Sequence, residues 1–309
     1  PIFLYLQAGG PTSVINASFL GLFDEAKKHE SQVYVSPYGL SSLLKDQIIE
    51  IKNINHNSLI KRPGSYFGSA RIHLKDIDTI DMIIKTLANN NIHQIFINGG
   101  NDTMDSALKI SSAAKRKKYD LQVIGIPKTI DNDLKETDHT PGYASASKFI
   151  INALASIIID DLSYKKGRIN IIEVMGRDSG YLALASNLVR KNGFTIDLTY
   201  IPEVPFSIDD FAKKASEIYE SKGRCITVVS EGIKDQHGKL ISSMQTEDAF
   251  GNIQMGGVSS YLANYLTRKG LKTRGIELNV LQRSAFFLTS DIDVKESYQA
   301  GKAAFRFAN

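Results

Sequence analysis

The feature of this sequence that most constrains its fold is a short apolar run that ends in a glycine turn and leads into a helical pattern. Clear cases are residues 2–10 (IFLYLQAGG) and 92–100 (IHQIFINGG), and 225–232 (CITVVSEG) is a further apolar run with the same ending. Strands that are apolar on both faces are typical of parallel sheets with helices packed on each side. The pattern therefore predicts an α/β fold in which helices cover both faces of mainly parallel sheets.

The same pattern places the other predicted elements along the chain. Apolar runs predict further strands within 121–133, 169–180 and 196–203, the first of them ending in a polar loop. Helical patterns follow or separate the strands at 13–28, 103–118, 181–191 and 209–222. In the first of these helices, residues 15, 19 and 23 share one apolar face because residues four apart lie on the same side. The segment 136–150 is expected to cross between two halves of the molecule.

Composition narrows the class of protein. The chain has 309 residues, enough for two domains or one large α/β unit. Its formal net charge of +4 is spread along the sequence, which favours an enzyme with anionic substrates over a nucleic-acid-binding protein. We find no apolar stretch long enough to span a bilayer and no signal-peptide pattern, so we expect a cytoplasmic protein with no membrane partner. The single cysteine, Cys225, excludes an internal disulfide framework, and its apolar neighbours predict a buried, unreactive thiol.

Glycine and polar clusters lie where the predicted strands end, and open parallel sheets bind ligands at the carboxyl ends of their strands. Gly9 and Gly10 precede a helix, whose N-terminal amides bind phosphate well. The loop 64–71 (GSYFGSAR) ends in Arg71, which suits a bidentate phosphate contact. The turn 99–103 carries an amide beside an acid. Together these clusters predict one large anion site, although each alone is also compatible with an ordinary turn.

Two further clusters hold groups suited to phosphoryl transfer. In residues 127–133 (PKTIDND), one carboxylate can accept a hydroxyl proton, another can help to hold magnesium, and the lysine can neutralise phosphate charge. In residues 175–180 (MGRDSG), Arg177 follows a glycine at a strand end, and with Arg274 and Arg283 it suits a sugar phosphate. The alternatives are a turn with solvated acids and surface ion pairs.

These motifs resemble those of the 6-phosphofructokinases, and in particular the pyrophosphate-dependent type. GGNDT, PKTIDND, EVMGRDSGYLAL, SEG and LQRS occur in the family's order over nearly the whole chain. The resemblance implies two doubly wound domains, a phosphoryl-donor domain at 1–140 plus 282–309 and a sugar-phosphate domain at 141–281. We expect the family's closing helix and strand to lie beyond the end of this sequence.

The resemblance also implies an activity and roles for individual residues. The activity is reversible transfer of a phosphoryl group from pyrophosphate to the C1 hydroxyl of fructose 6-phosphate, a step of glycolysis that uses Mg²⁺. Asp131 matches the base that takes the hydroxyl proton, Lys128 and Asp102 are further catalytic positions, and Asn101 and Asp133 match the metal site. The donor would be held by Gly10, Arg71, Gly100, Asn101 and Thr103. The sugar phosphate would be held by Thr129, Arg168, Met175, Gly176, Arg177, Glu231, Arg274 and Arg283.

Two of these positions bear on the choice of donor. Where ATP-using members carry glycines, this chain carries Asp102 and Lys128, as pyrophosphate-dependent members do. A carboxylate at 102 occupies the space of an α-phosphate and repels it. A lysine at 128 supplies a cation suited to a small, highly charged donor. We therefore predict pyrophosphate in preference to ATP.

Other positions concern assembly and keep alternatives open. Arg168 and Arg274 match residues that reach a neighbouring subunit's site, which implies a homodimer or homotetramer. Asn101 stands where an aspartate often serves magnesium, and Val280 stands where a histidine or tyrosine commonly contacts the sugar phosphate. These two departures favour a catalytically weak sugar-phosphate-binding relative, which the intact residues Asp131, Lys128 and Arg177 oppose. An ATP-dependent 6-phosphofructokinase is the other alternative, and sedoheptulose 7-phosphate stays open as a substrate.

Overall fold

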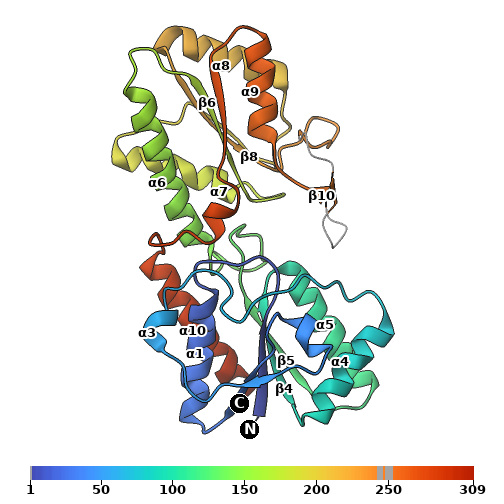
Figure 1. The fold of residues 1–309 in the computed structure, drawn as a ribbon. Helices are drawn as coiled ribbons and strands as arrows, with labels where there is room; N and C mark the ends of the chain where they lie inside the picture. Colours follow the sequence, from blue (N-terminus) through green and yellow to red (C-terminus); the bar gives the residue numbers. More distant parts are fainter. Residues whose placement is uncertain (1, 242–245, 248–252) are drawn as a thin grey trace. The chain divides into compact units, whose positions relative to one another are not determined.

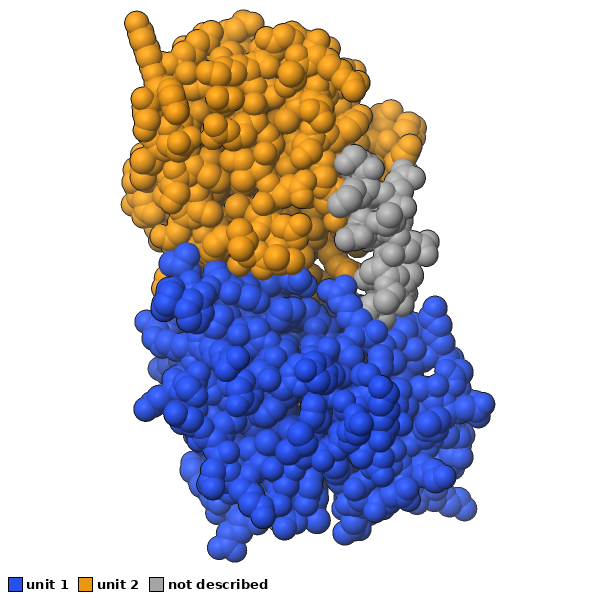
Figure 2. Space-filling view, in the orientation of Figure 1, with its two compact units in different colours: residues 1–130, 134–145, 283–309 blue, residues 131–133, 146–282 orange. Residues whose placement is uncertain are grey.

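The computed structural model describes residues 2–241, 246–247 and 253–309, and the chain forms two compact units (Figures 1 and 2). Unit 1 comprises residues 1–130, 134–145 and 283–309. Unit 2 comprises residues 131–133 and 146–282. The chain therefore contributes a short piece of the PKTIDND loop to unit 2 before it returns to unit 1.

Unit 1 is built on a five-stranded sheet with the order β3-β2-β1-β4-β5. β1 pairs in parallel with β2 and β4, β4 pairs in parallel with β5, and β3 runs antiparallel to β2. The order reverses between β1 and β4, and this switch point is where open α/β sheets bind ligands. The strands are β1 (Ile2–Gln7), β2 (Gln32–Val35), β3 (Ile49–Glu50), β4 (Gln94–Gly99) and β5 (Gln122–Pro127). The helices are α1 (Ile15–Lys28), α2 (Leu40–Leu43), α3 (His56–Leu59), α4 (Ile77–Asn89), α5 (Asn101–Arg116) and α10 (Asp291–Ala308).

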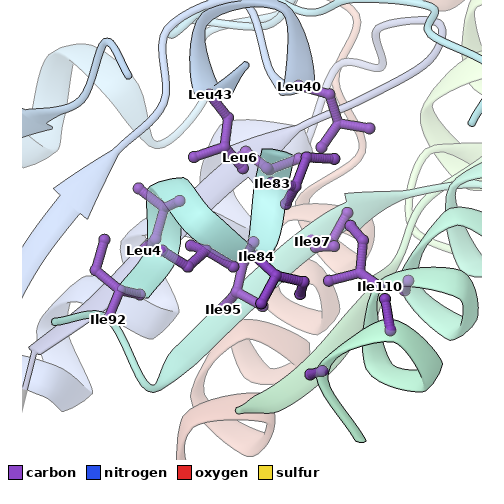
Figure 3. Close-up of a cluster of buried hydrophobic side chains, with 14 of the residues drawn as sticks. Leu4, Leu6, Leu40, Leu43, Ile83, Ile84, Ile92, Ile95, Ile97 and Ile110 are labelled. Atoms are coloured by element: carbon purple, nitrogen blue, oxygen red, sulfur yellow. The ribbon is translucent and has the colours of Figure 1, made fainter. Parts of the chain in front are cut away.

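The two faces of this sheet have separate apolar cores because successive residues of a strand point to opposite sides. Leu4 and Leu6 of β1 join side chains of α4 and α5 in the cluster shown in Figure 3. Phe3 and Tyr5, from the alternate positions, pack with side chains of α1 and α10. The helices α4 and α5 thus cover one face of the sheet, and α1 and α10 cover the other (Figure 1).

The close packing of α10 on α1 depends on two glycines. A Cβ atom added to Gly21 would lie 1.9 Å from the carbonyl oxygen of Tyr298, and one added to Gly301 would lie 1.8 Å from that of Ser18. Both distances are far below van der Waals contact, so glycine alone fits at either position. Through this packing, the last segment of the chain, residues 283–309, lies against the first helix and belongs to unit 1.

Unit 2 is built on a four-stranded parallel sheet with the order β11-β6-β8-β7. Every residue of β6 and β8 is buried, and apolar residues predominate in both strands. The helices α8 and α9 pack on one face of this sheet. The strands are β6 (Ile169–Val174), β7 (Leu198–Tyr200), β8 (Cys225–Ser230) and β11 (Thr273–Glu277), with a separate antiparallel pair β9 (Thr246–Glu247) and β10 (Ile253–Gln254). The helices are α6 (Tyr143–Leu162), α7 (Tyr181–Ala185), η1 (Ser186–Asn192), α8 (Ile208–Lys222), α9 (Val258–Arg268) and η2 (Asn279–Arg283).

The predicted α/β fold with parallel, helix-covered sheets is confirmed. The predicted helix at 181–191 is only partly α-helical, because a 3₁₀ turn replaces its second half. Within the segment 136–150, α6 already begins at residue 143. Cys225 is buried as predicted, and burial raises the pKa of its thiol to about 11, which keeps the thiol protonated and unreactive near neutral pH.

One expectation about membranes needs correction. We found no apolar stretch long enough to span a bilayer, but α6 has 20 residues with a mean hydropathy of 1.2 and satisfies that test by length and composition. The physical reason is that few charges interrupt the apolar positions 150, 154 and 158, which recur at four-residue spacing and are buried. A third of the tested window, 33%, is buried. A core helix of a globular unit meets the same test, so this helix is weak evidence for a membrane segment.

Candidate active site

The Gly9–Gly10 turn after β1 is surrounded by three cationic side chains of unit 1. Lys128, only 4% exposed, donates from Nζ to the carbonyl oxygen of Gly10 at 2.5 Å. A Cβ atom on Gly10 would lie 2.8 Å from Nη1 of Arg283 and 3.7 Å from Nη2 of Arg71. A side chain at position 10 would therefore push against the Arg283 guanidinium and touch that of Arg71. Because Gly10 has no side chain, the three cationic groups can lie close to its backbone. This arrangement is suited to binding phosphate oxygens.

A second glycine turn, Gly99–Gly100, follows the neighbouring strand β4. The backbone N–H of Lys128 donates to the carbonyl oxygen of Gly99 at 3.1 Å. A Cβ atom on Gly100 would lie 3.3 Å from the carbonyl oxygen of Lys128. The hydroxyl oxygen of Thr103 lies 3.9 Å from the position that a Cβ atom on Gly9 would occupy. The structure therefore brings the two glycine turns, Lys128 and Thr103 together at the switch point of the sheet.

The helix α5 begins at this second turn and carries the amide–acid pair. Gly100 is its N-cap, and a glycine has no side chain with which to cap the first amides of the helix. Asn101 and Asp102 are both exposed, and Asp102 is the acidic residue of the first turn. The helix N-terminus attracts an anion, whereas the Asp102 carboxylate adds negative charge at the same end. This combination admits a small anion and disfavours additional negative charge near residue 102.

The PKTIDND loop is held at two places. The backbone N–H of Thr129 donates to the carbonyl oxygen of Pro141 at 3.1 Å. The hydroxyl of Thr140 donates to the backbone carbonyl oxygen of Thr129 at 2.7 Å. Farther along, the hydroxyl of Ser179 donates to the backbone carbonyl oxygen of Asp131 at 2.8 Å. The side chain of Asp131 is half-buried and that of Asp133 is exposed.

The residues of MGRDSG and SEG meet at the carboxyl ends of β6 and β8 in unit 2. The backbone N–H of Arg177 donates to Oε1 of Glu231 at 3.2 Å. A Cβ atom on Gly232 would lie 1.6 Å from the carbonyl oxygen of Arg177, so this approach requires glycine. The backbone N–H of Met175 donates to Oε1 of Gln282 at 3.2 Å. Met175, Gly176, Arg177 and Glu231 therefore form one group, and their role at the sugar phosphate stays a prediction.

The electrostatics of this group centre on Glu231. Burial raises the pKa of its carboxyl to about 7, and the negative charge of Asp131 adds to that rise. The N–H of Arg177 and its guanidinium act in the opposite direction. Burial also raises the pKa of Glu173, whose carboxylate accepts a hydrogen bond from the N–H of Ser259 at 2.8 Å. Unit 2 thus gathers three acids, one of which titrates near neutral pH.

Arg168 and Arg274 lie at the other end of the same sheet. Arg168 directly precedes β6, and Arg274 is the second residue of β11, which pairs in parallel with β6. Because β6 has six residues, it separates Arg168 from Met175 by about 20 Å. Arg274 pairs with Asp160 at 3.1 Å, and the backbone N–H of Arg168 donates to Asp161 at 3.0 Å. The structure does not bring these two arginines to the Glu231 group of their own chain.

The remaining predicted positions differ in their surroundings. Arg283 was expected to bind the sugar phosphate, and its guanidinium lies beside Gly10 and Arg71, among the residues expected to hold the donor. Its assignment to the sugar phosphate stays a prediction. Val280 is 54% exposed, at the start of the 3₁₀ helix η2 that leads to Gln282.

The expected metal site can be tested by its donor atoms. Among the residues that the structure describes, no group of three or more His, Cys, Asp or Glu side chains is arranged to hold a metal ion. Magnesium characteristically uses one or two carboxylates together with substrate phosphates and water, so such a group is not required. The Asn101 amide oxygen and the Asp133 carboxylate are hard oxygen donors, and they fit Mg²⁺ chemically.

Sequence reasoning overlooked several residues that hold the site in place. Ser179 and Gln282 lie inside quoted motifs, and their hydrogen bonds to residues 131 and 175 are visible only in the fold. Asp293 is buried and accepts hydrogen bonds from the N–H groups of Gly142 and Ser145, each at 3.0 Å. Asn16 bridges α1 to the loop before Arg71. No local sequence pattern signals such long-range contacts.

With this geometry established, the comparisons with known proteins are informative. The sequence pattern described as phosphofructokinase matches residues 3–307. The chain belongs to the phosphofructokinase family. It is 37% identical to a pyrophosphate–fructose 6-phosphate 1-phosphotransferase of Rhodospirillum rubrum, with 98% of this chain and 78% of the relative aligned. It is 35% identical to the protein of the same name in Xanthomonas campestris, with 99% and 76% aligned.

A solved structure supports the same family membership. The pyrophosphate-dependent phosphofructokinase of Nitrosospira multiformis superimposes with a TM-score of 0.87 at 31% sequence identity. That alignment covers 99% of this chain and 76% of the other. The family predicted from the motifs is confirmed, and so is the two-part α/β fold that the family implies.

Proposed function

We propose that this protein catalyses reversible transfer of a phosphoryl group from pyrophosphate to the C1 hydroxyl of fructose 6-phosphate. The products are fructose 1,6-bisphosphate and phosphate, and the reaction belongs to glycolysis. The observation that carries the proposal is Lys128, a buried lysine fixed on the Gly10 carbonyl between two glycine turns. The names of the relatives from Rhodospirillum and Xanthomonas support the same donor and acceptor.

The donor is assigned to unit 1. Lys128 and Arg71 lie at Gly10 and supply positive charge for the phosphate oxygens of the donor, and Arg283 beside them keeps its proposed role at the sugar phosphate. The N-terminus of α5, at residues 100–103, adds backbone amides directed at an anion. Asp102 stands in the first turn of that helix, where its charge opposes the α-phosphate of a nucleotide. Pyrophosphate has no such group, so it is favoured over ATP.

The acceptor is assigned to unit 2, with Asp131 as the general base. Its carboxylate takes the proton of the C1 hydroxyl as the C1 oxygen forms its bond to phosphorus and the bridging P–O bond of pyrophosphate breaks. The hydroxyl of Ser179 donates a hydrogen bond to the backbone carbonyl oxygen of Asp131. This contact fixes the backbone from which the Asp131 side chain extends. Lys128 and the arginines stabilise the charge on the phosphoryl oxygens and on the departing phosphate. The remaining contribution is the correct positioning of the two substrates.

The sugar phosphate is assigned to Met175, Gly176, Arg177 and Glu231, with Thr129 at the start of the same loop as Asp131. Glu231 accepts hydrogen bonds from sugar hydroxyls, and Arg177 balances the phosphate charge. Arg168 and Arg274 lie at the opposite end of the unit 2 sheet, so we propose that they serve a neighbouring subunit. This assignment requires a homodimer or homotetramer. We propose that the enzyme works in the cytoplasm.

Magnesium is the proposed cofactor. When bound, it neutralises phosphate charge and orients the donor oxygens. Asn101 and Asp133 are the residues that would hold it, together with phosphate oxygens of the donor. Because the Asn101 amide contributes an oxygen but no charge, Lys128 and the arginines must balance more of the donor's charge.

The test of the proposed function is a coupled assay with fructose 6-phosphate and either donor. We expect turnover with pyrophosphate and little with ATP. In the double variant Asp102→Gly/Lys128→Gly we expect the ATP-to-pyrophosphate activity ratio to rise, because space is restored and a cation is lost. An unchanged ratio contradicts the role of this pair. Turnover with ATP alone favours an ATP-dependent enzyme, and no turnover with either donor favours a sugar-phosphate-binding relative.

A further inference from the structure

The side chain of Asn16, in the first turn of α1, is completely buried and uses its whole hydrogen-bonding capacity. Its Nδ2 donates to the carbonyl oxygens of Arg62 and Gly64, at 2.8 and 2.7 Å. Its Oδ1 accepts from the N–H of Tyr66 at 3.1 Å and from Nε2 of Gln7 at 3.1 Å. Three of these four partners belong to one loop, more than 40 residues away along the chain.

That loop, residues 62–70, runs beside the first glycine turn. Gly64 donates its N–H to the carbonyl oxygen of Thr12 at 3.0 Å. The ring of Phe67 packs edge-on against Phe19 with centroids 4.6 Å apart. At the far end, the hydroxyl of Ser69 donates to the carbonyl oxygen of Gly9 at 2.7 Å, and Gly9 donates its N–H to Ala70 at 3.3 Å. The loop is therefore fastened at its start by Asn16 and at its end by Gly9.

Arg71 is the next residue along the chain, and the position of its guanidinium depends on these fastenings. Arg71 is an exposed side chain on a loop with no regular secondary structure. Its Nη2 nevertheless lies 3.7 Å from the position that a Cβ atom on Gly10 would occupy. Contacts that fix the loop backbone also limit where the Arg71 side chain can reach. Asn16 makes three side-chain hydrogen bonds to that backbone.

We propose that Asn16 is a positioning residue for the phosphoryl donor: it fixes the loop 62–70 and so holds the Arg71 guanidinium at the Gly9–Gly10 turn. This inference rests on the proposed function, since that function makes pyrophosphate the anion bound by Arg71. Asn16 itself touches no substrate. Its loss weakens donor binding and leaves sugar-phosphate binding, which is assigned to unit 2, unchanged.

A purely structural role for Asn16 makes a different prediction, and Tyr5 provides the matched control. The Tyr5 hydroxyl lies in the same buried network, where it accepts hydrogen bonds from Gln7 at 3.1 Å and from Asn98 at 3.0 Å. It makes no hydrogen bond to the loop 62–70 among those that the structure describes. Tyr5→Phe keeps the ring and removes only this hydroxyl. A general loosening of the core therefore affects both variants alike, whereas loop positioning affects Asn16→Ala alone.

The experiment is steady-state kinetics on the full chain, with pyrophosphate and fructose 6-phosphate varied separately. The proteins are wild type, Asn16→Ala, Tyr5→Phe, Arg71→Ala and the double variant Asn16→Ala/Arg71→Ala. We expect Asn16→Ala to raise the KM for pyrophosphate by roughly tenfold or more, with the KM for the sugar phosphate within about twofold. In the Arg71→Ala background, we expect Asn16→Ala to have little further effect, because the group it positions is gone.

Two results overturn the proposal: equal effects on both KM values, or an undiminished effect of Asn16→Ala when Arg71 is already alanine. If Asn16→Ala does not fold, Ser69→Ala replaces it, because it removes one of the two hydrogen bonds that hold the other end of the loop and is expected to give the same selective effect. Wild-type turnover tests the proposed function separately. If the wild type uses ATP and not pyrophosphate, the proposed donor fails, and the same comparison with ATP as the varied donor decides the role of Asn16.

Discussion

The two units use the same architecture, a parallel sheet covered by helices, but they differ in the charge that they present at the carboxyl ends of their strands. In unit 1, Lys128, Arg71 and Arg283 surround a glycine turn. In unit 2, the corresponding end gathers Glu231 and Asp131, with Glu173 close enough to raise the pKa of Glu231 further. Cations attract phosphate oxygens, and carboxylates accept protons and hydrogen bonds from hydroxyls. The comparison teaches that one fold can serve as donor site or acceptor site according to the residues at its strand ends.

The largest effect on catalysis is expected from substitution of Asp131, one of the acids of unit 2. Asp131→Ala removes the proposed general base, and we expect kcat to fall by about 10³-fold or more, with a smaller change in KM. The measurement is the coupled assay at saturating substrates. Asp131→Asn is the matched control, because it preserves size and removes the basic oxygen. Near-wild-type kcat in either variant contradicts the assignment of the base.

The next effect compares the two units directly. Lys128→Met removes the buried cation while keeping most of the apolar stem, and we expect a loss of about 10²-fold in kcat/KM for pyrophosphate. Glu231→Gln is the matched variant in unit 2, and it is expected to raise the KM for fructose 6-phosphate while leaving that for pyrophosphate within about twofold. Steady-state kinetics on both variants, with each substrate varied separately, tests whether unit 1 binds the donor and unit 2 binds the acceptor. A reversed pattern, with the donor KM sensitive to Glu231, breaks the comparison.

The smallest effect is a pH dependence of sugar binding. The pKa of Glu231 is raised to about 7, chiefly by burial, so its carboxylate is protonated as the pH falls through neutrality. If the carboxylate accepts hydrogen bonds from sugar hydroxyls, the KM for fructose 6-phosphate rises as the pH falls below about 7. Titration of the substrate's own phosphate contributes to the profile in all variants. Glu231→Gln isolates the protein's share, and an identical profile in this variant contradicts the prediction.

The same shift has a consequence for stability. Because the folded pKa of Glu231 lies above the ordinary value of 4.5, the folded state binds more protons than the unfolded state between these values. Its contribution therefore favours folding at low pH and is lost as the pH rises through about 7. We expect the free energy of unfolding of Glu231→Gln, relative to wild type, to increase across this interval in urea titrations. A difference in free energy of unfolding between the two proteins that does not vary with pH contradicts this expectation.

Much of the fold was predictable because its signals are local. The strands β1, β4, β6 and β8 are mainly apolar runs, and burial of nearly all their residues explains that composition. β5 has a similar apolar sequence, although most of its residues are only partly buried. The glycine turns and the acids of residues 127–133 were found for the same reason, since they directly follow strands. What could not be predicted depends on contacts distant in sequence. Asn16 resembles any polar residue of a helix, and its role appears only when residues 62–66 are folded against it.

Arg283 illustrates the same limit within the site. From its motif, LQRS, Arg283 was predicted to bind the sugar phosphate. In the structure, Gln282 belongs to unit 2 and contacts Met175, whereas Arg283 belongs to unit 1 and lies beside Gly10. Adjacent residues of one motif thus join different units. Sequence order alone cannot show that division, because it arises where the chain passes from one unit to the other.

The most direct test of the assignment of donor and acceptor to different units is ligand titration monitored by NMR of backbone amides. Pyrophosphate with Mg²⁺ is expected to shift the resonances of Gly9, Gly10, Gly99 and Gly100, and fructose 6-phosphate is expected to shift those of Gly176 and Gly232. Lys128→Met and Glu231→Gln each serve as the control for one ligand. The account predicts that each ligand acts first on its own set of glycines. Pyrophosphate shifts concentrated at Gly176 and Gly232, with Gly10 unaffected, would contradict it.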